Sequence, residues 1–139
     1  MIEVKTAKEI TVAYIEGKGL NNFDKEEAEL KSIIEKNDIK TTESVIGIFY
    51  DNPADVGPEN VKWDVCIPVM KNSKINNIKT KTLKSAKFAS IIHKGTFDTL
   101  DKSFDEILSW ISSHNHEIVG PIREIYKNKT TTEIQIPIK

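Results

Sequence analysis

Val12-Ala-Tyr-Ile-Glu-Gly-Lys-Gly19 reappears later in the chain as Phe88-Ala-Ser-Ile-Ile-His-Lys-Gly95, so that Gly95 corresponds to Gly19. The segment Ile46-Gly-Ile-Phe-Tyr50 reappears in the same register as Ile122-Arg-Glu-Ile-Tyr126. Two distant matches in one register indicate an internal duplication. The duplication decides the fold, because each element in one half predicts an element in the other.

A third match has a slightly shorter shift. Asp64-Val-Cys-Ile-Pro-Val69 reappears as Glu133-Ile-Gln-Ile-Pro-Ile138, because the loop at 52–62 is longer than the loop at 127–131. Two long copies are too few for a solenoid, so the halves are expected to bury each other's faces. The sequence predicts one domain over residues 1–139, with modules at about 1–70 and 71–139. A ligand cleft is expected at their seam.

The composition is that of an ordinary soluble domain. Of the 139 residues, 38% are hydrophobic and 29% are charged, which suffices for a core. A net charge of −1 gives no electrostatic reason to expect nucleic acid binding, and there is no apolar run of membrane-spanning length. The N-terminus does not resemble a signal peptide, and the single cysteine, Cys66, excludes an internal disulfide. We therefore expect a cytoplasmic protein without a membrane or nucleic acid partner.

Hydrophobic periodicity predicts the same elements in both halves. Residues 2–16 read as extended, and a helix is expected from Asp24, with Glu27 completing its cap, to about Asn37. Residues 71–87 hold six lysines and no acid, which is typical of a solvated connector, here with strand character near its end. Strand, helix, strand and strand, repeated once, predict an α+β domain with a mostly antiparallel sheet. The other strands are expected at 45–50, 63–69, 88–93, 120–126 and 133–138, and the second helix at 97–112.

Several short motifs follow one another along the chain, and together they span most of its length. They are Tyr50-Asp-Asn-Pro53, Val61-Lys-Trp-Asp-Val-Cys-Ile-Pro-Val69, His93-Lys-Gly95, Leu100 with Trp110, Gly120-Pro121, Arg123-Glu-Ile-Tyr126 and Glu133-Ile-Gln-Ile-Pro137. Together they resemble the GyrI-like effector-binding domains. The resemblance implies two modules related by a pseudo-twofold axis, with a ligand groove between them.

Members of that family occur as effector domains of AraC-type and multidrug-responsive regulators, as gyrase-modulating proteins and as small hydrolases of strained electrophiles. Membership alone does not choose among these activities. The sequence leaves no room for a helix-turn-helix domain beside the module, so direct binding of DNA is not expected.

Glu124 is the first candidate for chemistry. The register that aligns Tyr126 with Tyr50 also aligns Glu124 with Ile48, so a carboxylate replaces an apolar residue in one copy. Period-two alternation places Ile122, Glu124 and Tyr126 on one strand face, where an acid is costly to bury without a partner. A pairing with a neighbouring basic residue, or exposure to water, would be the structural alternative. The resemblance implies a glutamate that attracts cationic aromatic ligands or serves as an acid/base in a hydrolase.

Four aromatic residues are candidates for the walls of the groove. Tyr50 and Tyr126 match each other in the repeat, and each packs at a strand end or contacts a ligand. Trp63 has Thr132 as its counterpart, and it stacks on a planar ligand or completes the core. Trp110 lies at the edge of the second helix's apolar stripe, as a core residue or as a wall facing Glu124.

The remaining reactive side chains favour structural roles. Cys66 has no base nearby in sequence and is expected to pack, and His93 is expected to make a structural hydrogen bond. His114 and His116 lack the further ligands that a zinc site needs. No motif suggests a cofactor or a metal.

The leading hypothesis is a free-standing small-molecule binding domain for hydrophobic, aromatic and cationic compounds. Glu124 would supply the charge, and the walls would be Ile48, Tyr50, Trp63, Trp110 and Tyr126. One alternative is a hydrolase of electrophilic small molecules with Glu124 as acid/base. Another is an interaction protein that modulates gyrase or a regulator.

Overall fold

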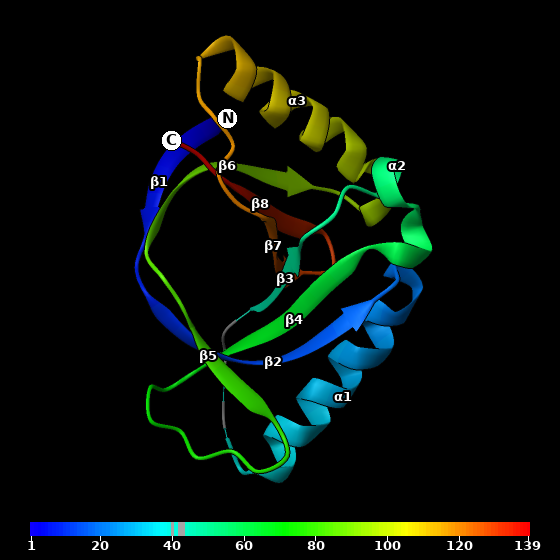
Figure 1. The fold of residues 1–139 in the computed structure, drawn as a ribbon, viewed down its shortest axis with the longest axis vertical. Coiled ribbons are helices and arrows are strands. Elements are labelled where there is room, and N and C mark those ends of the chain that lie inside the picture. Colours follow the sequence, from blue (N-terminus) through cyan, green and yellow to red (C-terminus); the bar gives the residue numbers. More distant parts are fainter. Residues whose placement is uncertain (40, 42–43) are drawn as a thin grey trace.

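The structure is a computed structural model, which describes residues 1–39, 41 and 44–139. In these residues an eight-stranded antiparallel sheet packs against two long helices, α1 (Phe23–Lys36) and α3 (Leu100–Ser113) (Figure 1). The predicted α+β class and antiparallel sheet are confirmed. The strands are β1 (Ile2–Ala7), β2 (Ile10–Lys18), β3 (Val45–Phe49), β4 (Lys62–Val69), β5 (Lys79–Leu83), β6 (Ala86–Lys94), β7 (Ile122–Asn128) and β8 (Thr131–Pro137). Short helical turns lie at α2 (Pro53–Val56), η1 (Leu20–Asn22), η2 (Pro58–Asn60) and η3 (Phe97–Thr99).

The strand order is β1-β6-β8-β7-β3-β4-β2-β5, and the sheet curls (Figure 1). Directly paired residues share a face, and one such row runs from Val65 through Gly47 and Glu124 to Ile134. Val65 belongs to the core beneath α1 and Ile134 to the core beneath α3. Both helices therefore cover one face, which we call the helix face.

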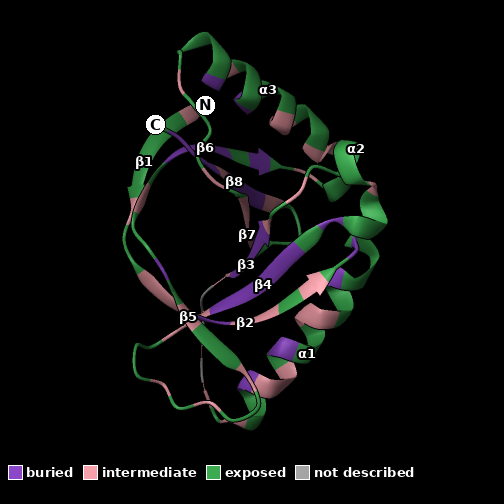
Figure 2. Cartoon of the chain, in the orientation of Figure 1, coloured by how far each residue is buried: buried purple, intermediate pink, exposed green. Residues whose placement is uncertain are grey.

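The opposite face, which we call the inner face, has a buried cluster of its own. It contains Val12, Ile46, Ile48, Cys66 and Leu83, which are all at most 7% exposed. On the helix face, burial follows the spacing of one helical turn, with Leu30 and Ile34 on α1 and Ile107 and Ile111 on α3 (Figure 2). The sheet is thus apolar on both faces at its centre.

The two modules exchange their first strands. The predicted extended segment at 2–16 is interrupted at Lys8 and Glu9, which leaves β1 and β2 as separate strands. β1 pairs with β6 of the second module, whereas β5 of the second module pairs with β2 of the first. Each half therefore completes the sheet of the other, and the connector's expected strand is β5.

A lysine on each exchanged strand pairs with a buried carboxylate of the other module. Lys81 on β5 contacts Asp64 on β4, and Lys5 on β1 lies 3.5 Å from Glu133 on β8. Lys81 corresponds to Lys5 in the register that aligns the two glycine turns, and Glu133 corresponds to Asp64 in the register of the third match. Asp64 and Glu133 are 3% and 5% exposed. The duplication thus extends to the ion pairs that hold the exchanged strands.

We predict that Lys81→Met lowers the free energy of unfolding by about 2–4 kcal/mol, because it leaves the buried Asp64 carboxylate without its cation. Lys79→Met is the matched control on the same strand, since Lys79 pairs at 3.7 Å with Glu16 and both side chains are largely exposed. It should cost less than about 0.5 kcal/mol. Urea unfolding of both variants checks this, and equal losses would contradict the role of the Asp64 pair.

Candidate functional site

Glu124 and Tyr126 lie two residues apart on β7, so both side chains point to the helix face. The Tyr126 hydroxyl donates a hydrogen bond of 2.8 Å to Oε1 of Glu124. Glu124 is half-buried, and in the part of the chain that the structure describes no cation pairs with it. The central strand therefore presents a carboxylate whose one side-chain partner among these residues is neutral.

Gly47 lies directly opposite Glu124 on β3. A Cβ atom at this position would lie 2.9 Å from the Tyr126 hydroxyl oxygen and 2.8 Å from the Phe49 ring. Contacts that short require Tyr126 or Phe49 to move. Gly47 therefore provides the room in which Tyr126 reaches Glu124.

Aromatic rings surround Tyr126. Phe23, the first residue of α1, and Phe97, in the turn before α3, each make an edge contact with its ring at a centroid distance of 5.8 Å. Phe49 stacks on Phe23 at 5.6 Å. Phe97 is 56% exposed, so the group is open to solvent on that side. The starts of both helices thus bring phenyl rings to the strand that carries Glu124.

These phenylalanines were not among the residues predicted for the site. A weaker signal was present, because Phe23 begins α1 and Phe97 begins the short turn that leads into α3. Phe49 could not be found by matching letters, because its relation to Tyr126 depends on the register between β3 and β7.

Burial raises the pKa of the Glu124 carboxyl, and the hydrogen bond from Tyr126 acts in the opposite direction. Burial and the neighbouring Glu124 raise the pKa of Tyr126 well above its usual range, and Glu27 and Asp24 of α1 contribute to this shift. The hydroxyl therefore remains a donor at neutral pH. The negative charges around it favour an approaching cation over an anion.

Ile48 and Tyr50 do not lie with Glu124, contrary to the expectation from the repeat. In the antiparallel register Ile48 pairs with Arg123, so it points to the inner face. Tyr50 follows the same alternation, and its hydroxyl donates to Asp64. The physical reason is a slip of one residue, which reverses the face of every side chain. The structural counterparts of Glu124 and Tyr126 are therefore Gly47 and Phe49.

Trp63 lies in the core and not at an open wall. It is 1% exposed, its ring edge meets the ring of Phe23 at 5.0 Å, and its indole N–H donates to the Gly19 carbonyl oxygen at 2.9 Å. The ring lies against Gly17, where a Cβ atom would lie within 2.5 Å of it. Trp63 packs against Phe23 within the core, so it could affect a ligand site only through the position of Phe23.

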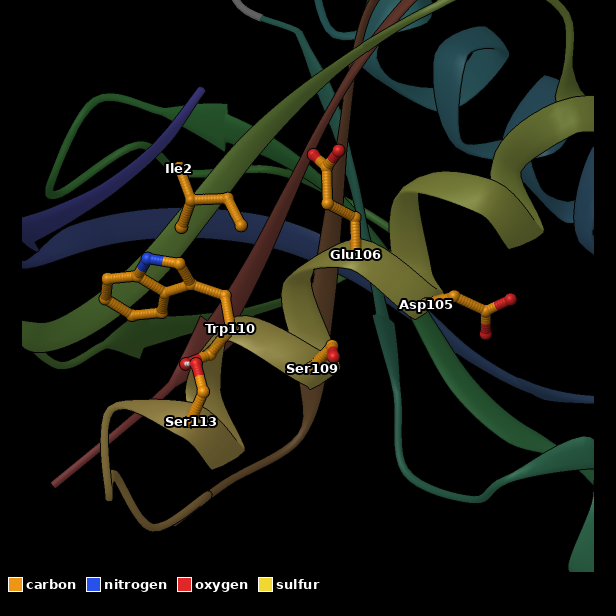
Figure 3. Close-up of a pocket in the computed structure, with 6 residues that line it drawn as sticks. All are labelled: Ile2, Asp105, Glu106, Ser109, Trp110 and Ser113. Atoms are coloured by element: carbon orange, nitrogen blue, oxygen red, sulfur yellow. Dashed lines mark hydrogen bonds between the residues drawn. The ribbon is translucent and has the colours of Figure 1, made fainter.

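Trp110 faces away from Glu124. It lies beside Ile2 of the edge strand β1, which is separated from β7 by β6 and β8 (Figure 3). Its indole stacks on His114 with a centroid distance of 4.2 Å and on His116 at 5.6 Å. An open depression of about 510 Å³ lies here, lined by Ile2, Asp105, Glu106, Ser109, Trp110 and Ser113. Of the two expectations for Trp110, the structure supports the core residue, because Trp110 is partly buried against the core beneath α3, and not the wall facing Glu124.

The other reactive side chains have structural contacts. Nδ1 of His93 lies 2.7 Å from the Ser103 hydroxyl, and Nε2 lies 3.0 Å from the Thr99 hydroxyl. Cys66 is buried, and burial raises the pKa of its thiol to about 12, so the thiolate is not formed at neutral pH. Among the described residues no three metal-ligating side chains come together, and no helix is long and apolar enough to span a membrane.

A duplicated α+β domain with a lone carboxylate among aromatic rings has the features of a small-molecule binding domain. The family model for the GyrI-like small molecule binding domain matches residues 1–139. The chain belongs to this family. Comparison with curated protein sequences gives no match.

Solved structures with the same fold show little sequence identity. The EcmrR C-terminal domain is 17% identical with a TM-score of 0.84, covering 100% of this chain and 97% of that one. In the complex of EcmrR with DNA, the chain spans 57% of the longer EcmrR chain, with 17% identity and a TM-score of 0.83.

Two further structures carry functional descriptions of their own. SAV2435 bound to tetraphenylphosphonium is 14% identical with a TM-score of 0.68, covering 100% of this chain and 94% of that one. A hydrolase from Listeria innocua is 12% identical with a TM-score of 0.76, covering 99% of this chain and 91% of that one. At these identities the likeness shows the fold alone.

We predict that the Glu124 carboxyl titrates above its ordinary value of 4.5 and that Tyr126→Phe raises its pKa further, because the hydroxyl stabilises the charged form. With a folded pKa above the unfolded one, this group makes the protein less stable as pH rises from 4.5 through the folded value. Carboxyl ¹³C NMR titration of both proteins checks the prediction. A lower Glu124 pKa in Tyr126→Phe would contradict the assigned hydrogen bond.

Proposed function

We propose that this domain binds hydrophobic organic cations, with the Glu124 carboxylate as the counter-charge. The observation that carries the proposal is the state of Glu124, a half-buried acid on the central strand whose side-chain partner among the described residues is the Tyr126 hydroxyl. A carboxylate in partly apolar surroundings attracts a cation more strongly than one in water, because the local dielectric constant is lower. A bound cation would also lower the Glu124 pKa and hold the ionised form.

The rings around Glu124 support an aromatic or otherwise bulky cation. Phe97 is exposed and makes an edge contact with Tyr126, so its ring is accessible to a ligand beside Tyr126. Phe23 is buried and stacks on Phe49, so these two rings form an apolar support beside Tyr126, and the exposed Phe97 offers the cation–π surface. Trp63 below Phe23 limits how far these rings can retreat. A flat or branched organic cation fits this surface better than a hydrated metal ion.

The likeness to SAV2435 bound to tetraphenylphosphonium supports the choice of a lipophilic cation as ligand. That this chain also binds a lipophilic cation is our proposal. We also propose a cytoplasmic setting, which the single buried thiol of Cys66 suits. A protein partner such as gyrase or a regulator stays a prediction from the family resemblance.

Isothermal titration calorimetry with tetraphenylphosphonium tests the binding proposal. Wild-type protein should bind the cation, and Glu124→Gln should weaken binding by about 10- to 100-fold, the effect of losing one partly buried opposite charge. Affinity for the wild type should rise with pH as Glu124 loses its proton, and Glu124→Gln should lose this pH dependence.

Glu106→Gln is the matched control, because Glu106 lines the separate depression beside Trp110. It should keep wild-type affinity. If Glu106→Gln weakens binding and Glu124→Gln does not, the cation binds beside Trp110 and the proposed site is wrong. If neither variant changes the affinity, the Glu124 carboxylate does not anchor the cation and its proposed role is wrong. If the wild type does not bind the cation, an interaction protein acting through its surface becomes the better hypothesis.

A hydrolase remains the second candidate, because burial raises the pKa of the Glu124 carboxyl and a raised pKa favours proton exchange by a carboxyl group. The Listeria innocua hydrolase of the same fold supports it. In such a reaction Glu124 would accept a proton from water as the water oxygen attacks an epoxide carbon and the ring carbon–oxygen bond breaks. The released oxygen would then take a proton back from Glu124 to give the diol, and Tyr126 would hold the carboxylate in position.

The hydrolase predicts that the protein converts styrene oxide to its diol with more than one turnover per chain. Glu124→Gln should abolish conversion while its melting temperature stays at or above that of the wild type, since it removes a charge that is costly to bury. Chromatographic detection of the diol checks this. Conversion no faster than in buffer, by protein that binds tetraphenylphosphonium, would exclude this hydrolase and leave the binding domain.

A further inference from the structure

Four strands place an acidic side chain on the inner face of the sheet, and each of these acids forms an ion pair with a lysine. Glu3 lies 4.0 Å from Lys5, Glu16 lies 3.7 Å from Lys79, Asp64 contacts Lys81, and Glu133 lies 3.5 Å from Lys5 and 3.4 Å from Lys127. Asp64 also accepts from Tyr50, and Glu133 accepts from Ser90 at 2.7 Å and from Gln135 at 2.9 Å. The carboxylates on this face are therefore already paired.

Arg123 lies on the same face, but among the described residues it forms no ion pair with an acidic side chain. In the described part of the chain no ion pair or hydrogen bond involves its guanidinium, and its Nε is the one buried side-chain nitrogen or oxygen without a partner. Its two terminal nitrogens are not buried and also lack a protein partner there. A half-buried cation that stays unpaired among paired carboxylates leaves donors for a ligand.

The surroundings hold the guanidinium in place. Its Cζ lies 4.7 Å from the centre of the Phe88 ring, which is fully buried. On the neighbouring strands Ile48 and Gln135 lie directly opposite Arg123. Burial lowers the pKa of the Arg123 guanidinium, which remains charged at neutral pH. The charge is thus partly desolvated, and the Phe88 ring contacts the guanidinium.

The residue type is informative as well. Arg123 is the single arginine of the chain, which otherwise uses lysine for its permanently charged basic side chains. Lysine serves every ion pair described in the sheet, and arginine occurs at the position without one. Two parallel N–H groups in a rigid plane match the two oxygens of a carboxylate or phosphate, whereas an ammonium group acts as a point charge.

We propose that Arg123 is the anchor of a second ligand site, on the inner face, which takes a small oxyanion such as a carboxylate or a phosphate group. The anion accepts two hydrogen bonds from the terminal nitrogens of the guanidinium. Lys5, Lys81 and Lys127 belong to the same face, where they are paired with Glu133 and Asp64. The site is separate from the cation site, because Glu124 lies on the opposite face of the same strand.

The single arginine makes a direct test possible, because its Nε–Hε signal in a ¹⁵N NMR spectrum needs no assignment. Titration with sodium acetate and, separately, with inorganic phosphate should shift this signal in a saturable manner, and the stronger response identifies the preferred oxyanion. Sodium chloride at equal ionic strength should leave it in place. A shift that grows linearly and equally with all three salts would show an adventitious ion only and overturn the proposal.

Arg123→Lys keeps the charge and should weaken oxyanion binding at least about tenfold, the equivalent of one charge-assisted hydrogen bond. The change is read from the backbone amide signals of Ile48 and Gln135. Lys84→Gln, an exposed lysine between β5 and β6, is the matched control and should leave binding unchanged. Unchanged affinity in a folded Arg123→Lys would refute the bidentate contact.

Glu124→Gln should also keep full oxyanion binding. This result would separate the two sites, because it holds whether or not the cation proposal is correct. A loss of oxyanion binding in Glu124→Gln would contradict the independence of the inner-face site.

Discussion

The exchange of first strands between the modules is the constraint on which the rest of this structure depends. β1 completes the second module's sheet and β5 completes the first, so neither half has a full sheet of its own. Lys5 and Lys81 connect these strands to the buried carboxylates of Glu133 and Asp64. Ion pairs of this kind contribute less to stability than to specificity, because the acids are satisfied only when each strand lies in the correct register.

The exchange also fixes the centre of the sheet, where β3 and β7 meet. With β1 and β5 at the outer edges, the pairing of β3 with β7 joins the two modules at the centre of the sheet, in addition to the two exchanged pairings near its edges. Adjacent residues of β7 then present opposite charges to opposite faces, Glu124 toward the helices and Arg123 toward the inner face. Each lacks a charged protein partner among the described residues. The strand at the seam thus combines a structural role with two unsatisfied charges.

The sequence was sufficient for the class of fold, the positions of both helices and the placement of Glu124 and Tyr126 on one strand face. Alternation and helical spacing are local properties, and the repeat tests them twice. Sequence reasoning failed where the argument needed register. Ile48 and Tyr50 were placed by matching letters, yet a slip of one residue between β3 and β7 sends both to the inner face. The exchange of β1 and β5 has no local signature at all, because strand pairing is decided by long-range contacts.

The two copies differ at the central pair Glu124 and Gly47, and the symmetry of the duplicated sheet explains why. Near a pseudo-twofold axis, a residue on β7 faces its own counterpart on β3, and here Glu124 faces Gly47. A glutamate in both copies would place two half-buried carboxylates side by side, and one of them would remain protonated. A larger apolar residue at position 47 would displace Tyr126 or Phe49. One acid opposite one glycine therefore avoids a second carboxylate and leaves room for the Tyr126 hydrogen bond, and it requires the two copies to differ at this position.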